Sequence, residues 1–235
     1  MSVPLVFLPG FMCDARLFWH QILEFSADRG VVTAPLQGAT IEEMASAVLA
    51  MAPPKFALVG HWLGGLVAME ILRRVPERVS EIALMNVSPL AEPPAVAGQR
   101  EPRIIRARTG RLDEVMLEEV PEAALAPGEG RTEVQAMLLD MAGTLGAETF
   151  TRQSRALMRR PDQQRALRNT RLRAMLICGE YDTICPPRRH EFLAELMPHA
   201  EYRLIMGAGH LSPLEQPVKV SRALRDWLDA PLLLR

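Results

Sequence analysis

The sequence predicts an α/β fold in which a mostly parallel, doubly wound sheet is covered by helices on both faces. Apolar strands alternate with amphipathic helices along most of the chain, and the strands are continuous apolar runs without alternating polar positions. One long block without a convincing strand follows Asn86 and interrupts this alternation. We therefore expect a parallel sheet with an all-helical insertion at one of its ends.

Each predicted strand is a short apolar run bounded by turn-forming residues. The first run, PLVFL, stops at Pro9-Gly10, as a buried strand followed by a turn would. The predicted strands cover residues 4–8, 31–34, 56–59, 82–86, 174–178 and 202–205.

The helices between these strands have recognisable starts. Asp14 can cap the first helix, and Thr40 with Glu43 three residues later forms a capping box before IEEMASAVLAM. The helix that begins near Leu63 must end before Pro76. The predicted helices cover residues 14–25, 41–51, 63–75, 187–197 and 214–229.

The block between Asn86 and Arg173 contains amphipathic helical segments at 112–120, 132–145 and 152–160. We assign residues 1–89 and 173–235 to the core and residues 90–172 to a helical cap that is not an independent domain. Within the cap, AEPPAVAGQREPR at 91–103 is the closest approach to a linker.

Five arginines lie close together early in the cap. They either bind an acidic substrate tail or form a solvated helix face, and the sequence leaves both interpretations open. These residues are Arg100, Arg103, Arg106, Arg108 and Arg111.

Composition excludes several function classes. The chain has 235 residues, 49% hydrophobic and 23% charged, which is typical of a single globular α/β domain. Its net charge of −1 does not favour binding to nucleic acid. Three cysteines without metal-ligand spacing predict neither a metal site nor a disulfide framework, and they favour the cytoplasm. The apolar run in MSVPLVFLPG is too short to span a membrane and follows no basic segment, so we expect neither a signal peptide nor a membrane anchor.

Residues with catalytic potential follow four of the predicted strands. Ligands of open parallel sheets bind at the carboxyl ends of the strands. PGFM, GHWLGG, GEYD and GAGH occupy these positions after the strands at 4–8, 56–59, 174–178 and 202–205. The last three supply, in chain order, a Gly-flanked turn around Trp62, an acid at Asp182 and a histidine at His210.

Together these segments resemble the α/β-hydrolases, in particular the small capped esterases, enol-lactonases and related carbon–carbon bond hydrolases. LVFLPGF is similar to the family's first oxyanion segment, GHWLGG to its nucleophile elbow, GEYDTICP to its acid loop and GAGHLSPLEQP to its histidine loop. The order nucleophile, acid, histidine is also that of the family. The resemblance covers almost the whole chain, although the opening strand hairpin of longer members is missing. It implies the α/β-hydrolase fold and a small-molecule acyl substrate, an ester or a lactone, with no metal or organic cofactor.

The resemblance also implies a role for each matching residue. His210 would be the general base, and Asp182 would hold its tautomer and stabilise the imidazolium. The backbone N–H groups of Phe11 and Leu63 would form the oxyanion hole. Trp62 stands at the position of the nucleophilic serine.

Trp62 is the departure from the family pattern. Gly60 and Gly64 retain the room that the strained central residue of an elbow requires. An indole cannot be acylated, however, because its N–H is only a hydrogen-bond donor. Removing the nucleophile of a comparable triad lowers turnover by on the order of a million-fold. We therefore expect ordinary serine-hydrolase turnover to be essentially absent in this form.

Three explanations of Trp62 remain open. The chain derives from a serine hydrolase altered at position 62 by engineering or in the clone, where a single base change (TCG to TGG) is sufficient. Alternatively, it is a natural pseudo-hydrolase that binds a small molecule or a protein, or an enzyme of the lyase or cofactor-free oxygenase type that needs only a His–Asp dyad.

Other candidate residues have weaker support. Cys13 is a conceivable replacement nucleophile, but the motif directs His210 toward position 62. Ser88 and Ser212 lie near strand ends without an elbow around them, and His61 is expected to serve in packing and hydrogen bonding.

Overall fold

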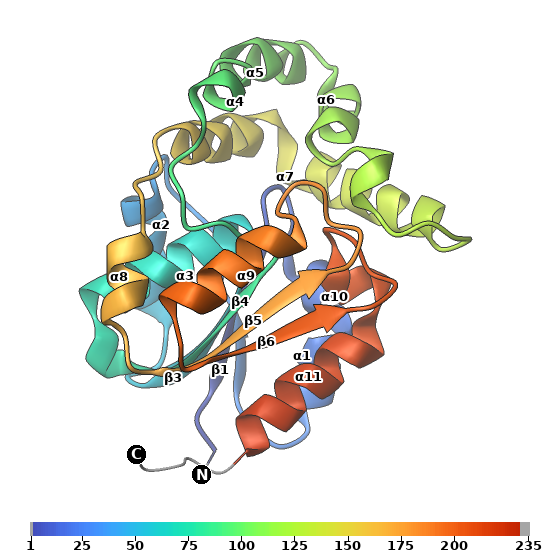
Figure 1. The fold of residues 1–235 in the computed structure, drawn as a ribbon. Helices are drawn as coiled ribbons and strands as arrows, with labels where there is room; N and C mark the ends of the chain where they lie inside the picture. Colours follow the sequence, from blue (N-terminus) through green and yellow to red (C-terminus); the bar gives the residue numbers. More distant parts are fainter. Residues whose placement is uncertain (1, 231–235) are drawn as a thin grey trace.

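Six parallel strands form one sheet in the computed structural model, which describes residues 2–230 (Figure 1). The strands are β1 (Leu5–Leu8), β2 (Val31–Thr33), β3 (Phe56–His61), β4 (Val79–Met85), β5 (Arg173–Gly179) and β6 (Ala200–Ile205). Their order across the sheet is β2-β1-β3-β4-β5-β6, and every neighbouring pair is parallel. The predicted parallel sheet is confirmed.

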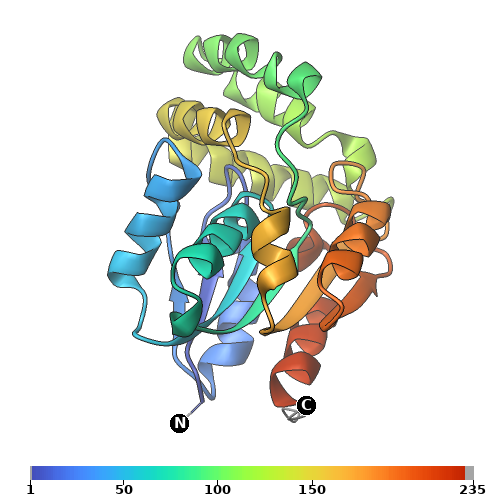
Figure 2. The same cartoon turned by 60° about the vertical axis from the view of Figure 1, so that its left-hand side comes forward.

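Helices cover both faces of this sheet, as Figures 1 and 2 show. On one face α1 packs against α11, and on the other α3 lies over β1, β3 and β4 beside α2, while α9 lies over β5 and β6. These helices are α1 (Trp19–Ser26), α2 (Ile41–Met51), α3 (Leu63–Arg74), α9 (Pro187–Leu196) and α11 (Pro217–Asp229).

Burial explains the continuous apolar strands. Every residue of β1 and β3 is buried, and β5 is buried from its second residue onward. These strands are covered on both faces, so neither set of alternate side chains meets water. The edge strands β2 and β6 are only partly buried.

The chain between β4 and β5 is helical, and most of it lies over the end of the sheet to which the strands point (Figure 1). The helices α5, α6 and α7 pack against one another, whereas α8 packs against α3 and α9. We refer to residues 94–158 as the cap helices; the division of the chain at 90–172 stays a prediction. The elements here are α4 (Pro94–Ala97), α5 (Arg100–Arg108), α6 (Leu112–Glu119), the 3-10 turn η3 (Glu122–Ala124), α7 (Arg131–Met158) and α8 (Gln164–Asn169).

Two expectations about the helices need correction. The linker-like segment at 91–103 contains α4 and the start of α5. The two helices expected at 132–145 and 152–160 correspond to the two parts of α7, which the non-helical Gly146 separates, although the second part begins earlier than predicted. The last predicted helix, 214–229, is divided by Pro217 into α10 (Ser212–Glu215) and α11. Proline opens a helix well but cannot donate the hydrogen bond that would continue the preceding one.

Two starts of helices are as the sequence predicts. Thr40 caps α2 by accepting a hydrogen bond from the backbone N–H of Glu43 at 3.1 Å. Asp14 likewise caps the 3-10 helix η1 (Ala15–Phe18), which leads into α1. Among residues 2–230, no helix has both the length and the apolar character needed to cross a bilayer.

Candidate active site

Trp62 occupies the sharp turn between β3 and α3. Its φ of 42° and ψ of −108° lie outside the regions that residues with side chains normally adopt. The turn is held by backbone hydrogen bonds on both sides: Trp62 N–H donates to the Met85 carbonyl at 2.9 Å, and its own carbonyl accepts from Leu66 N–H at 3.1 Å. The strained backbone expected at an elbow is therefore present at position 62.

Gly60 and Gly64 allow the chain to pass closely through this turn. A Cβ on Gly60 would lie 2.6 Å from the Gly64 carbonyl oxygen, and a Cβ on Gly64 would overlap with the Leu8 carbonyl. Backbone atoms block both directions, so a side chain at either position would force the strand–turn–helix unit apart.

The indole of Trp62 is 6% exposed and packs between two aromatic rings. Its centroid lies 4.5 Å from that of His210 in an edge-to-face arrangement and 5.3 Å from that of Phe11. The side chain thus fills the space beside the imidazole that an acyl group would need.

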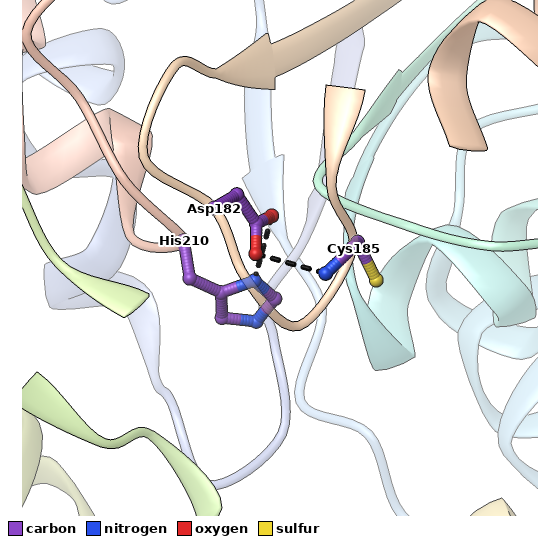
Figure 3. Close-up of side chains that lie close together, drawn as sticks. All are labelled: Asp182, Cys185 and His210. Carbon is purple, nitrogen blue, oxygen red and sulfur yellow. Dashed lines mark hydrogen bonds and ion pairs between the residues drawn. The ribbon is translucent and has the colours of Figure 1, made fainter. Parts of the chain in front are cut away.

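His210 and Asp182 meet through a buried hydrogen bond. Nδ1 of His210 lies 2.9 Å from Oδ2 of Asp182, and both side chains are fully buried (Figure 3). Because an ionised carboxylate only accepts, Nδ1–H donates this hydrogen bond, which selects the tautomer whose lone pair is on Nε2. Nε2 is buried and has no hydrogen-bond partner among the described residues.

Asp182 is held by four hydrogen bonds. Oδ1 accepts from the backbone N–H groups of Ile184 (2.9 Å) and Cys185 (2.8 Å), while Oδ2 accepts from Nδ2 of Asn86 (2.9 Å) and from His210. Burial acts to raise the pKa of Asp182, but the adjacent imidazole and these hydrogen bonds outweigh it and hold the pKa well below its usual value. The carboxylate is therefore ionised and fixed in orientation.

Two backbone N–H groups next to Trp62 are candidates to stabilise an oxyanion. Leu63 is the first residue of α3, where N–H groups have no acceptor within the helix. Phe11 follows β1 in the turn after Pro9-Gly10. Neither N–H has an acceptor among residues 2–230.

His61 ties the elbow to the His210 loop. Its Nε2 lies 2.7 Å from the carbonyl oxygen of His210, so Nε2–H donates. Burial, followed by the proximity of His210, lowers the pKa of His61 to about 3, so the ring is neutral near pH 7. His61 has the packing and hydrogen-bonding role that the sequence predicts.

The buried group Asp182, Cys185 and His210 has the residue types of a metal site, with ligand atoms within 4.8 Å of one another. The hydrogen bonding of this group does not fit a metal site. The backbone nitrogen of Cys185 faces the carboxylate (Figure 3), and all four hydrogen bonds to Asp182 use its oxygens. Burial raises the pKa of the Cys185 thiol well above its usual value, whereas a metal requires the thiolate.

The other nucleophile candidates are not activated. Cys13 donates from Sγ to the Phe11 carbonyl at 3.4 Å, and burial, followed by the charge of Asp14, raises its pKa. Ser212 donates to Oδ1 of Asn86 at 2.6 Å, and Ser88 accepts from Arg189 at 3.2 Å. None of these residues has a base positioned to remove its proton.

Sequence reasoning missed Asn86 and Glu215. Asn86 follows β4 with φ of 48° and donates to both Asp182 and the Gly209 carbonyl. Glu215 accepts from the backbone N–H groups of Gly209 and Leu211 at 2.9 Å each and of Ala126 at 2.6 Å. A polar residue at the end of a strand was an available signal for Asn86, but no local pattern marks Glu215.

The cap arginines are mostly occupied by cap carboxylates. Arg100 is buried and pairs with Glu92 through two hydrogen bonds of 2.5 and 2.7 Å. Arg103 pairs with Glu119, and Arg106 pairs with glutamates of α6. Arg100 is therefore not part of a solvated helix face, and it is not free to bind an acidic substrate tail, so neither of the two interpretations of the arginine cluster applies to it.

Surface cavities border the cap. One of about 480 Å³ lies between α1, α7 and α10, and another of about 300 Å³ lies near Glu215 and the start of α7. Neither is lined by Trp62, Asp182 or His210.

Comparisons with known proteins agree with this architecture. A family model described as "Alpha/beta hydrolase family" matches residues 5–223. The chain is 28% identical over 211 residues to a pimeloyl-[acyl-carrier protein] methyl ester esterase of Aromatoleum aromaticum, covering 82% of this chain and 81% of the relative. In structure it is similar to a thermophilic esterase from Thermogutta terrifontis, with a TM-score of 0.87, 24% identity and coverage of 97% and 90% of the two chains. An enol-lactonase from Burkholderia xenovorans LB400 gives a TM-score of 0.85 at 21% identity, covering 98% of this chain and 92% of the other.

Proposed function

Because the chain belongs to the alpha/beta hydrolase family, we propose that its site is that of a hydrolase of small carboxylic esters or lactones whose nucleophile position is occupied by Trp62. Similar proteins are named as esterases and a lactonase, which supports this class of substrate. The form with Trp62 is inactive or strongly impaired in this reaction.

The observation that carries the proposal is the unpartnered Nε2 of His210. A buried nitrogen with a lone pair and no donor among the described residues is costly, so it calls for an explanation. Its imidazole is oriented by Asp182 and lies beside the turn at position 62. A serine at this turn would supply the missing hydroxyl donor.

With serine at position 62, the residues would act in a fixed order. Nε2 of His210 takes the hydroxyl proton while the serine oxygen bonds to the carbonyl carbon of the ester. The N–H groups of Phe11 and Leu63 stabilise the resulting oxyanion. As the carbon–oxygen bond to the alcohol breaks, His210 returns the proton to the leaving oxygen. Water, deprotonated by His210, then bonds to the acyl carbon; the bond between this carbon and the serine oxygen breaks, and His210 returns the proton to the serine oxygen.

A His–Asp dyad acting without a nucleophile is less well supported. Such an enzyme needs its substrate against Nε2 of His210, where the Trp62 indole packs. Neither of the two surface cavities reaches this atom.

The decisive variant is Trp62→Ser. We expect it to hydrolyse short p-nitrophenyl esters with a burst and to form a covalent adduct with a fluorophosphonate, seen by mass spectrometry at the introduced serine. Trp62→Ala is the matched control, because it vacates the same space without adding a nucleophile. The serine variant should exceed it by about 10⁴- to 10⁶-fold in kcat.

The double variant Trp62→Ser with His210→Ala should lose this activity. If the serine variant does not exceed the alanine variant on a panel of esters and lactones, the proposal is wrong. His210-dependent conversion of an acidic heterocycle or a cyanohydrin by the Trp62 form would instead favour the dyad. A small molecule or protein retained tightly by the Trp62 form would favour a binding function.

A further inference from the structure

The turn that carries the Phe11 N–H has a strained peptide. Cys13 N–H donates to the Gly10 carbonyl at 3.1 Å, which closes a four-residue turn with Phe11 and Met12 in its centre. Met12 has φ of 53°, whereas Phe11 does not have a positive φ. A positive φ at the third position is the pattern of a type II turn, which normally holds glycine or asparagine there. Another interaction must therefore stabilise the positive φ of Met12.

Gln153 of α7 contacts this peptide. Its Oε1 accepts a hydrogen bond from Met12 N–H at 2.8 Å, and the side chain is buried although 141 residues separate the two positions. On the other side of the same peptide, the Phe11 carbonyl accepts from Sγ of Cys13 at 3.4 Å. Rotating the peptide would turn the Phe11 carbonyl toward Oε1 of Gln153, which would place two acceptors together.

A second contact of α7 reaches the same turn. The ring of Phe150 lies 5.3 Å from that of Phe11 in an edge-to-face arrangement. Phe150 and Gln153 are three residues apart, so they lie on one face of the helix. This face of α7 therefore holds both the side chain of Phe11 and the peptide that follows it.

We propose that Gln153 is a positioning residue that fixes the Phe11–Met12 peptide and thereby the oxyanion turn. The docking of a cap helix is in this way coupled to the placement of the Phe11 N–H. The inference rests on the proposed function for its catalytic consequence, but the orientation of the peptide can be measured in the Trp62 form. Gln153 carries no ionisable group, so its effect is independent of pH.

The first test uses hydrogen exchange of the Met12 amide, followed by NMR in the Trp62 form. Gln153→Met keeps the length of the side chain but removes the acceptor, and we expect Met12 to exchange at least about tenfold faster. Gln153→Glu retains an acceptor and should restore the protection. Ser154→Ala is the control: Ser154 is the next residue of α7, it is also buried, and its hydroxyl has no partner among the described residues. Equal exchange in Gln153→Met and the parent would overturn the proposal.

The second test measures kinetics in the Trp62→Ser background. Loss of one oxyanion donor lowers kcat by about 10²- to 10³-fold, so a displaced donor should lower it about tenfold or more with little change in KM. Gln153→Glu should recover part of kcat, and Ser154→Ala should leave it unchanged. An active serine variant whose kcat does not respond to Gln153→Met would overturn the positioning role. A serine variant without any turnover would count against the proposed function alone, since the exchange experiment still decides how Gln153 acts.

Discussion

Asn86 joins three parts of the site through one side chain. Its amide nitrogen donates to Asp182 and to the Gly209 carbonyl, and its amide oxygen accepts from Ser212. Its φ of 48° is a conformation that asparagine tolerates better than most residues. Asn86 thereby holds the carboxylate and the backbone before His210 in one arrangement.

Ser212→Ala tests this arrangement at the level of one hydrogen bond. The substitution leaves the buried amide oxygen of Asn86 without its donor, so the free energy of unfolding should fall by about 1–3 kcal/mol. Ser154→Ala removes an equally buried hydroxyl that has no hydrogen-bond partner within residues 2–230, and the change in the free energy of unfolding should be close to zero. Urea denaturation of both variants measures the difference. Equal losses in the two would show that the Asn86–Ser212 bond contributes nothing specific.

Helix α7 is bent where its backbone leaves the helical region. Gly146 has φ of 77° and ψ of 167°, a combination essentially restricted to glycine. Phe150 and Gln153, which contact the turn at Phe11, follow the bend. The bend therefore directs the second half of α7 toward the site.

Two glycines of α7 give opposite predictions. Gly146→Ala should lower the free energy of unfolding by about 1–3 kcal/mol, because alanine disfavours this backbone although nothing lies within 4 Å of a Cβ there. Gly143→Ala lies in regular helix with equally open surroundings and should raise it by about 0.5–1 kcal/mol. Thermal or urea unfolding measures the change in the free energy of unfolding for each variant. A stabilising Gly146→Ala would exclude the bend as a fixed feature.

The stability of the whole molecule should depend on buried neutral histidines. Burial lowers the pKa of His61 to about 3 and that of His190 to about 4, and Nε2 of His190 accepts from the Val87 N–H at 3.2 Å. From pH 6.5 downward, the unfolded chain binds protons at these residues while the folded chain does not. The contribution of these histidines to the free energy of unfolding is complete above pH 6.5. It is lost as the pH falls toward 4, by about 1.4 kcal/mol per pH unit for each histidine.

We predict that His190→Gln reduces this pH dependence. The stability lost between pH 6.5 and 5 should be smaller by about 1–2 kcal/mol than in the parent, as measured by urea unfolding. His199→Gln, at an exposed position, is the control. Burial raises the pKa of Glu215, so this residue adds to the free energy of unfolding as the pH falls, whereas the histidines lower it. The effect of Glu215 is the same in the parent and in both variants, and it cancels in the comparison. An identical loss in parent and His190→Gln would refute the assignment.

The parts of the molecule that depend on neighbours in sequence could be predicted, and those that depend on distant contacts could not. Buried strands and the turn at Trp62 follow from local apolar runs and glycines. The linker expected at 91–103 is wrong because prolines fit the first turn of a helix, as in α4 and α5, as readily as they form loops. The contact of Gln153 with Met12 and that of Glu215 with Ala126 span 141 and 89 residues, so no local pattern could indicate them.

The hydrogen bonds between the cap and the His210 loop also constrain when the protein can complete its fold. Ala124 accepts from the N–H of His210 at 2.7 Å, and Glu215 binds the N–H of Ala126. During synthesis, α5, α6 and the first half of α7 leave the ribosome long before β6 and its following loop exist. The cap helices can pack on one another and on the turn at Phe11 at that stage, but their hydrogen bonds to the His210 loop form only when the last quarter of the chain arrives. The cap is therefore tied to the His210 loop only when synthesis is almost finished.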